Sequence, residues 1–361
     1  MAKEALHNLK KTDNLFQLRG KVVGVKSQNF YKSGTGKNNG AWNKITFGVQ
    51  IAENKPVYVT LNGYTRPEVF YYAKGENGEK GTTKRVAWKD RHKSPGEGFN
   101  LIGVKISVDK TEDGNVNKIF TEYDAVEHLH TSLKDGDEVF IKGTIDFTSY
   151  TDSKGQVKRF VNLVPNQISY SLQPIDFDAE NFKEMAEFEN TLVFSSIDQE
   201  EDEKGNKTGR FILSGYSIGY NTVENVSFII EEEDKVLANG IKKLVKAGNS
   251  IKTFGKINVI VTLSNAGDDD SMGRVSSPMD RKRLDSSVRY EYVIYDAKRK
   301  SIDTTTYSEK EISAALKKIK ASKEATTNFG DKPTTKANID NEVDDDDWGD
   351  GFDDDSNPWE E

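Results

Sequence analysis

The sequence predicts a mainly β protein, made of two small five-stranded barrels in tandem, one helix after the second barrel and a disordered acidic tail. Three observations lead to this prediction. Short stretches with apolar residues at every second position, which are typical of strands, recur along most of the 361 residues. The order of these stretches, with one helical stretch among them, occurs twice. The last residues, 340–361, contain twelve carboxylates and no Lys or Arg.

The first half of the chain carries three predicted strands, then a helix, then two strands. The helix is expected at 123–133, where Val126, Leu129 and Leu133 have helical spacing. The strands of this half are expected at 18–25, 45–51, 57–61, within 133–145 and at 157–168.

The second half repeats this order. Residues 234–246 are a helix candidate with the apolar residues Val236, Leu237, Ile241, Leu244 and Val245. The strands are expected at 190–197, 210–216, 226–230, 251–261 and 288–295.

A direct internal match supports the repeat. LKDGDEVFIKGTI at 133–145 aligns with VKAGNSIKTFGKI at 245–257, which pairs Gly136 with Gly248 and Gly143 with Gly255. A glycine within a strand permits the sharp bend at the corner of a small barrel. Five strands with the helix between the third and the fourth is the order of the OB-fold. A pair of unrelated β-sandwiches is the alternative, because short strands do not fix topology.

These patterns divide the chain into segments. Between the third strand and the helix, the first barrel carries a long insertion that is either functional or flexible. Ser308 and Glu311 have capping-box spacing, and Ile312, Ala315, Leu316 and Ile319 follow as one apolar stripe, which predicts a helix that packs on the second barrel. The expected segments are a flexible N-terminus 1–13, barrel 1 at 14–173 with its insertion 64–108, barrel 2 at 186–297, the helix 308–322, and a disordered linker and acidic tail 323–361.

The tail differs in charge from the rest of the chain. Of the 59 acidic residues, twelve lie in 340–361, which leaves 47 against 51 basic residues and a formal charge of +4 for residues 1–339. Such a block of like charges is expected to be disordered. Its exposed aromatics Trp348, Phe352 and Trp359 are expected to bind partner proteins as anchors among the acids. A tail that only solubilises the protein is the alternative.

The composition and the motifs argue against several classes of protein and several kinds of site. The absence of Cys excludes disulfides and thiolate metal sites, and no stretch of about twenty apolar residues is present, so we expect a cytoplasmic protein without membrane contact. His128 and His130 would diverge around a helix, and Gly34-Thr35-Gly36-Lys37 lacks the spacing of a phosphate loop and is interpreted as a loop. No catalytic residues emerge. We expect neither an enzyme, nor a cofactor, nor a metal site.

Binding of single-stranded nucleic acid fits the sequence better. Such binding needs cations along the backbone and aromatic faces on which bases stack. If the alternate apolar residues of 45–51 face the core, Trp42 and Lys44 project to the opposite face, and the same argument for 57–61 puts Tyr58 outward. The insertion has basic residues around Trp88, and Lys32 lies in a flanking loop. The predicted DNA-binding residues are Trp42, Lys44, Tyr58, Lys84, Arg85, Trp88, Lys89, Arg91, Lys93, Tyr150, Lys158, Arg159 and Phe160.

The chain resembles the single-stranded DNA-binding proteins of bacteria and tailed phages. GDEVFIKG at 136–143 is similar to the fourth strand of their barrels, and DDDDWGDGF and DDDSNPW are similar to their tails. The bacterial tails end in Pro-Phe, whereas Pro358-Trp359 is followed here by Glu360 and Glu361. The resemblance implies a phage protein of DNA replication, recombination or repair that coats single-stranded DNA and recruits other replication proteins through its tail, with oligomers possible. The alternatives are a structural protein of a virion and an acidic mimic of DNA.

Overall fold

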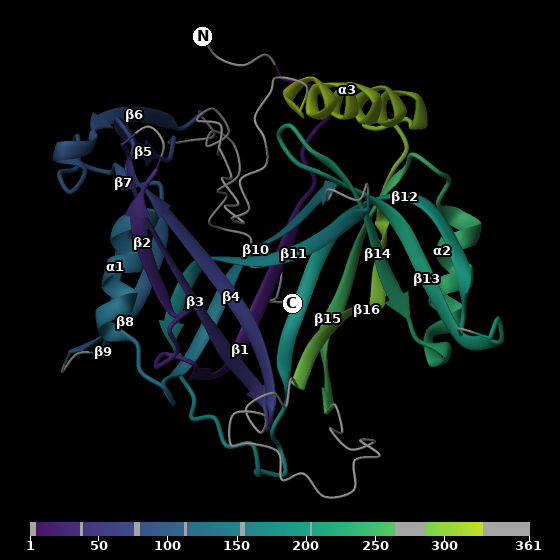
Figure 1. Cartoon of the computed structure of the whole chain (residues 1–361), viewed down its shortest axis with the longest axis horizontal. Helices are drawn as coiled ribbons and strands as arrows, with labels where there is room; N and C mark the ends of the chain where they lie inside the picture. The colour runs from purple at the N-terminus through teal and green to yellow at the C-terminus, as the bar shows by residue number, and fades with distance from the viewer. Residues whose placement is uncertain are drawn as a thin grey trace, which may run out of the picture.

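Two β-barrels lie side by side, and strands that run between them join the two (Figure 1). The computed structural model describes residues 5–36, 39–75, 80–111, 114–151, 156–202, 204–263 and 286–327. In these ranges no helix is long and apolar enough to cross a membrane. The predicted fold class, mainly β with two OB-like barrels and a helix after the second, is confirmed.

Barrel 1 is built around its first strand. Strand β1 (Asn14–Val23) pairs antiparallel with β3 (Ala41–Ala52) on one side and with β10 (Glu138–Thr151) on the other. Strand β4 (Lys55–Tyr64) pairs with β3, and β11 (Val157–Tyr170) pairs with β10. Helix α1 (Glu122–Ser132) precedes β10 and buries Val126 and Leu129. The order of three strands, helix and two strands is therefore the one the sequence predicts.

Two additions to barrel 1 differ from the sequence-based expectation. Tyr31–Thr35, expected to be a loop, forms strand β2, which pairs with the beginning of β3. Within the range expected for the insertion, β8 (Val104–Thr111) pairs in parallel with β11 and, through a hairpin, with β9 (Gly114–Phe120). The barrel sheet thus resumes at Val104. The segment between β4 and β8 forms a separate sheet of β5 (Glu68–Ala73), β6 (Thr82–Ala87) and β7 (Asn100–Leu101), called here the inserted sheet.

Barrel 2 is a closed ring. Its strands are β12 (Met185–Glu201), β13 (Lys207–Ile218), β14 (Val223–Ile230), β15 (Ser250–Leu263) and β16 (Ser286–Asp303), and helix α2 (Lys235–Leu244) lies between the third and fourth strands. Strand β12 pairs with both β13 and β15, and the third strand β14 runs parallel to the fifth strand β16. This closure is the OB-fold arrangement that the strand order predicts.

The internal sequence match corresponds to equivalent positions in the two barrels. Phe16 of β1 faces Gly143, and Phe188 of β12 faces Gly255. A β-bulge lies immediately before each glycine, in the ladders β10–β11 and β15–β16. The turns before the two strands each contain a glycine with positive φ, Gly136 (91°) and Gly248 (83°). The repeat is therefore structural as well as sequential.

The barrels share one apolar core rather than two. The first half of β1 pairs antiparallel with β12, so one sheet runs through both barrels. Phe147, on the hairpin of β10 and β11, lies against Phe228 and Tyr292 of barrel 2, with ring centroids 6.2 and 6.4 Å apart. In the opposite direction, Tyr290 of β16 reaches β4, where its hydroxyl donates to the carbonyl oxygen of Pro56 (3.2 Å). Each barrel thus contributes its last hairpin to the other.

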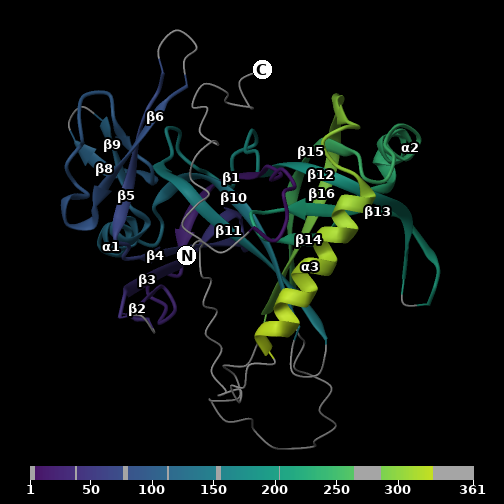
Figure 2. The ribbon, with the colours of Figure 1, turned by 90° about the horizontal axis from the view of Figure 1, so that it is seen from above.

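Helix α3 (Glu309–Thr327) follows β16 and packs on barrel 2 (Figure 2). Ser308 forms the expected contact with Glu311, its Oγ lying 2.6 Å from the carboxylate, and Ile312, Ala315 and Ile319 are buried. The N-terminal segment differs from the flexible one expected for 1–13. Leu6 and Leu9 pack against the same cluster as α3, and the Thr12 backbone N–H donates to the carbonyl oxygen of Ile218 (2.9 Å). Residues 323–327, expected to begin the disordered linker, belong to α3, and the rest of the expected linker and tail lies outside the described residues.

Candidate functional site

The outer face of β2, β3 and β4 carries the first three predicted residues. Ile45, Phe47 and Val49 are buried in the core, so Trp42 and Lys44 lie on the opposite face, as the alternation predicts. On β4, Val57 and Val59 are buried while Tyr58 is 47 % exposed. We call this surface the strand face.

Three strands contribute to the strand face in register. Gly34 of β2 lies opposite Trp42, and a methyl group at Gly34 would come within 3.0 Å of the indole ring. Two residues along each strand, on the same face, Lys32 of β2 lies directly opposite Lys44 of β3. Lys44 in turn lies opposite Asn62 of β4. The face therefore presents Trp42 and then two lysines, with Tyr58 further along.

The two lysines are a like-charged cross-strand pair. Like charges directly opposite each other on one face of a sheet are destabilising. Burial, together with the charge of Lys32, lowers the pKa of Lys44. In the described part of the chain, neither lysine has a carboxylate partner. An anion bound between the two ammonium groups would remove the repulsion.

Barrel 2 borders the strand face near Tyr58. The backbone N–H of Tyr58 donates to the hydroxyl oxygen of Tyr290 (3.1 Å), and burial raises the pKa of Tyr290 to about 12. Tyr290 is therefore a neutral donor and acceptor at neutral pH. The neighbouring barrel fixes this end of β4 and leaves the Tyr58 ring half exposed.

The hairpin of β10 and β11 carries a second group of predicted residues. Tyr150 and Phe160 stack with nearly parallel rings, with centroids 5.3 Å apart and an interplanar angle of 7°. The two rings remain 48 % and 41 % exposed, which is unusual for large aromatics in contact. Lys158, opposite Tyr150, is exposed on the same face as the two rings, whereas Arg159, opposite Ser149, is exposed on the other face of the hairpin. Flat exposed rings among cations are what stacking of nucleic-acid bases requires.

The inserted sheet carries the third group. Lys84 lies over the ring of Phe99, with its Nζ 4.2 Å from the centroid, and the guanidinium of Arg85 lies 5.5 Å from the centroid of Phe70. Both cations are exposed, as are Lys89 and Lys93, although Lys93 pairs with Asp90 (2.9 Å). This surface offers cations over aromatic rings at the side of barrel 1.

Trp88 and Arg91 hold the inserted sheet on barrel 1. Arg91 makes a bidentate ion pair with Asp124 of α1 (2.8 and 3.0 Å), its guanidinium lies 4.5 Å from the Trp88 ring centroid, and its carbonyl oxygen accepts a hydrogen bond from Tyr71. Trp88 packs edge-on against Tyr123. Burial acts to raise the pKa of Asp124, but hydrogen bonds from Arg91 and Thr121 outweigh it and hold that pKa below its usual range. Arg91 and Trp88 therefore have structural contacts that the sequence reasoning did not predict.

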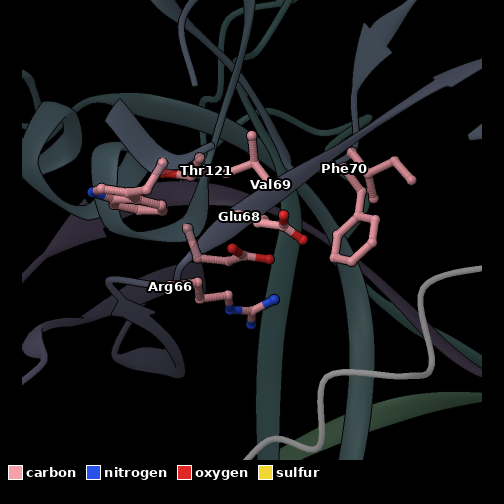
Figure 3. A pocket seen from close by; sticks show the side chains of 8 residues that line it. Arg66, Glu68, Val69, Phe70 and Thr121 are labelled. Atoms are coloured by element: carbon pink, nitrogen blue, oxygen red, sulfur yellow. The ribbon is translucent and has the colours of Figure 1, made fainter. Parts of the chain in front are cut away.

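A small pocket lies beside this contact (Figure 3). Its lining includes Arg66, Glu68, Phe70 and Trp88, together with Thr121 and Glu122 at the start of α1. These side chains include no His, Cys or Lys. In the described residues, no group of three or more His, Cys, Asp or Glu could hold a metal ion.

The structure brings the predicted residues together in three groups rather than one. The strand face and the inserted sheet lie on barrel 1, whereas the hairpin reaches across barrel 2, where Ser149 donates to Glu224 (2.6 Å) (Figure 1). Lys32, interpreted only as a flanking loop residue, is part of the strand face because β2 is a strand. The stretch Tyr31–Thr35 has no alternation of apolar and polar residues, so no local signal in the sequence predicts this strand. The aromatics Trp348, Phe352 and Trp359 lie outside the described residues.

A family model described as YorF matches residues 74–332, well over half of the chain. The chain belongs to the YorF family. The YorF match begins in the inserted segment and includes the hairpin of β10 and β11 and all of barrel 2. No curated protein matches the chain.

Solved structures similar to this YorF-family chain include single-stranded DNA-binding proteins. The wild-type protein from Thermus aquaticus is 9 % identical, with a TM-score of 0.35, covering 80 % of this chain and 94 % of the other. A deletion mutant of it gives 10 % identity, a TM-score of 0.36, and coverage of 80 % and 95 %. A Plasmodium falciparum protein of this kind, in complex with single-stranded DNA, is 8 % identical, with a TM-score of 0.17 and coverage of 46 % and 97 %. Likeness of this degree carries no argument about function.

Proposed function

We propose that this chain binds single-stranded DNA without sequence preference and is not an enzyme. The observation that carries the proposal is the strand face. There Lys32 and Lys44, which have no carboxylate partner among the described residues, lie on the same outer surface as Trp42 and Tyr58. Two adjacent ammonium groups fit a phosphodiester backbone, and ring faces accept any base. Neither feature distinguishes one base from another.

The stacked pair Tyr150 and Phe160 supports the same proposal. Base stacking on an aromatic ring contributes about 1–3 kcal/mol per base. A duplex keeps its bases stacked on each other, so exposed ring faces favour a single strand. The cations of the inserted sheet, Lys84, Arg85 and Lys89, would extend the contact along the backbone.

A binding titration tests the proposal. Poly(dT) is added to the full chain, and tryptophan fluorescence is followed at two salt concentrations. We expect quenching, and binding that weakens as salt increases, with log K falling by roughly 0.7 per phosphate contact per log unit of salt. Fluorescence that changes with neither poly(dT) nor salt would overturn the proposal. Competition by duplex DNA and by RNA then defines the preferred nucleic acid.

Paired variants locate the site. The double substitution Lys32→Gln and Lys44→Gln removes two cations, so the salt slope is expected to fall by about 1.4. Lys242→Gln with Lys243→Gln, on the exposed side of α2, is the matched control and should leave the slope unchanged. Equal slopes for the two double variants would exclude the strand face as the binding site.

We further propose that the protein acts in phage DNA replication or recombination, in the host cytoplasm, and that its acidic tail recruits partner proteins through Trp348, Phe352 and Trp359. The tail also competes with DNA, because twelve carboxylates are attracted to the same cations. Deleting residues 340–361 is therefore expected to tighten poly(dT) binding, most strongly at low salt. Unchanged affinity at low salt would exclude competition, and loss of partner capture by the deletion variant would be the evidence for recruitment.

A further inference from the structure

Helix α3 covers part of the outer face of barrel 2, where β13 ends and β14 begins. Phe211 and Leu213 of β13 lie in or against the barrel core, so alternation directs Tyr216 and Ile218 outward. The outward residues pack in one apolar cluster with buried residues of α3. The members of this cluster on the two sides are Val193, Tyr216, Ile218 and Val223 of the barrel, and Ile312, Ala315 and Ile319 of the helix. The outer face of β13 and β14 is therefore closed to a ligand where α3 lies.

The opposite side of α3 is basic. Lys317 and Lys318 are exposed, and no carboxylate occurs between residues 312 and 322. Lys310 is also exposed but lies between the exposed Glu309 and Glu311. In the part of the chain that the structure describes, Lys317 and Lys318 have no ion-pair partner. The helix thus covers part of the sheet with its apolar side and exposes lysines on its other side.

The basic helix and the aromatic hairpin both lie against β14. Val223 belongs to the cluster under α3, and the next residue, Glu224, accepts a hydrogen bond from Ser149 of the hairpin (2.6 Å). Because neighbouring residues of a strand face opposite ways, Tyr150 points away from Glu224 and toward solvent, where it stacks on Phe160.

We propose that the exposed lysines of α3, with Lys317 and Lys318 at their centre, form a second contact surface for the nucleic-acid backbone, continuing from Tyr150 and Phe160. Cations beside exposed rings are the combination that binds a single strand of nucleic acid. The proposal rests on the proposed function. It adds that a long single-stranded nucleic acid contacts both barrels, whereas a short one is bound by the strand face of barrel 1 alone.

The test uses the full chain and two oligonucleotides, dT of about 10 and about 40 nucleotides, since one OB-fold holds about 4–16. Lys317→Glu with Lys318→Glu is expected to weaken binding of the long oligonucleotide about tenfold and to leave the short one unchanged. Lys242→Glu with Lys243→Glu, on α2, makes the same change in net charge and controls for long-range repulsion. It should change neither affinity.

Two outcomes overturn the proposal and are distinguishable. If the two double variants bind the long oligonucleotide with equal affinity while the wild-type chain still binds it, the α3 surface is excluded as a contact site. The proposed function is then unaffected. If the wild-type chain binds neither oligonucleotide, both the α3 contact surface and the proposed function are excluded. Thermal unfolding of each variant, compared with wild type, shows whether the substitutions act on binding and not on folding, since all four lysines are exposed.

Discussion

Gly143 lies where the fourth strand of barrel 1 passes close to two neighbours. A Cβ added there would lie 2.1 Å from the carbonyl oxygen of Val164 and 2.7 Å from the ring of Phe16. Gly255 has the same relation to Val293 and Phe188 in barrel 2. At both positions the backbone of the next strand approaches too closely for any side chain, which explains why the two halves of the sequence both have glycine there.

Gly143→Ala is therefore expected to destabilise the protein by about 2–3 kcal/mol, because the strand ladder must move to admit the methyl group. Urea unfolding followed by circular dichroism measures the change. Gly240→Ala is the control. Gly240 lies in α2 with no atom within 4 Å of an added Cβ, so alanine there should stabilise by roughly 0.5–1 kcal/mol through helix propensity. Similar losses in both variants would contradict the steric explanation.

At the scale of elements, an ion pair attaches the inserted sheet to helix α1. Arg91 follows the short 3₁₀ helix Trp88–Asp90 and reaches Asp124 in the first turn of α1, where Thr121 caps the helix and also donates its hydroxyl to Asp124 (2.8 Å). Both side chains of the ion pair are mostly buried, at 21 % and 15 % exposure. This contact fixes where the cations of the inserted sheet lie relative to barrel 1.

Asp124→Asn is expected to lower the free energy of unfolding by about 2 kcal/mol at neutral pH, because the Arg91 guanidinium loses its charged partner. The pKa of Asp124 is depressed in the folded state, so its contribution is complete above the unfolded pKa of about 4 and is lost as pH falls through the folded pKa. The difference in the free energy of unfolding between the wild type and Asp124→Asn should therefore become smaller as the pH is lowered. Urea unfolding at several pH values measures it.

Asp90→Asn is the control for this prediction. Asp90 also forms an ion pair, with Lys93, but at the surface, so its removal is expected to leave the unfolding curve close to that of the wild type. If the difference in the free energy of unfolding between the wild type and Asp124→Asn stays constant as the pH falls, the charge of the Asp124 carboxylate is not the cause of the destabilisation.

At the scale of the whole molecule, the two barrels are bound together by exchanged hairpins and a shared sheet. Phe147 of barrel 1 lies among Phe228 and Tyr292 of barrel 2, and Tyr290 of barrel 2 hydrogen-bonds to β4 of barrel 1. Pairing of β1 with β12 continues the backbone ladder between them. We expect the barrels to unfold together rather than in two steps.

Phe147→Ala tests this coupling. The substitution removes a half-buried ring from the contact between the barrels and is expected to cost about 2–3 kcal/mol. Calorimetry should show a single transition at a lower temperature than in the wild type. Two separated transitions in the variant, with one of them unshifted, would indicate that the barrels are stable independently.

Much of the fold followed from local patterns. Alternation of apolar residues predicted the burial of Ile45, Phe47 and Val49, and the repeated glycines predicted two barrels of the same kind. The alternation also predicted the outward position of Tyr58 on the strand face. These predictions succeeded because side-chain direction in a strand depends only on neighbours along the chain.

Contacts between residues distant in sequence could not be predicted in this way. Nothing local to Tyr31–Thr35 shows that it pairs with β3, which is what sets Lys32 opposite Lys44. Arg91 was predicted to bind DNA because it lies in a basic stretch, yet its partner Asp124 is 33 residues away. The N-terminal segment was expected to be flexible, but Leu6 and Leu9 pack beside α3.

The sequence by itself determined the two barrels, the helix after them and the acidic tail composition, because each depends on periodicity or charge within one short stretch. Only the tertiary structure decided that the predicted binding residues form three separate surfaces, and that α3 closes the outer face of barrel 2. Both follow from how the barrels exchange hairpins and where α3 packs, and these arrangements depend on burial of apolar area between segments far apart in the chain.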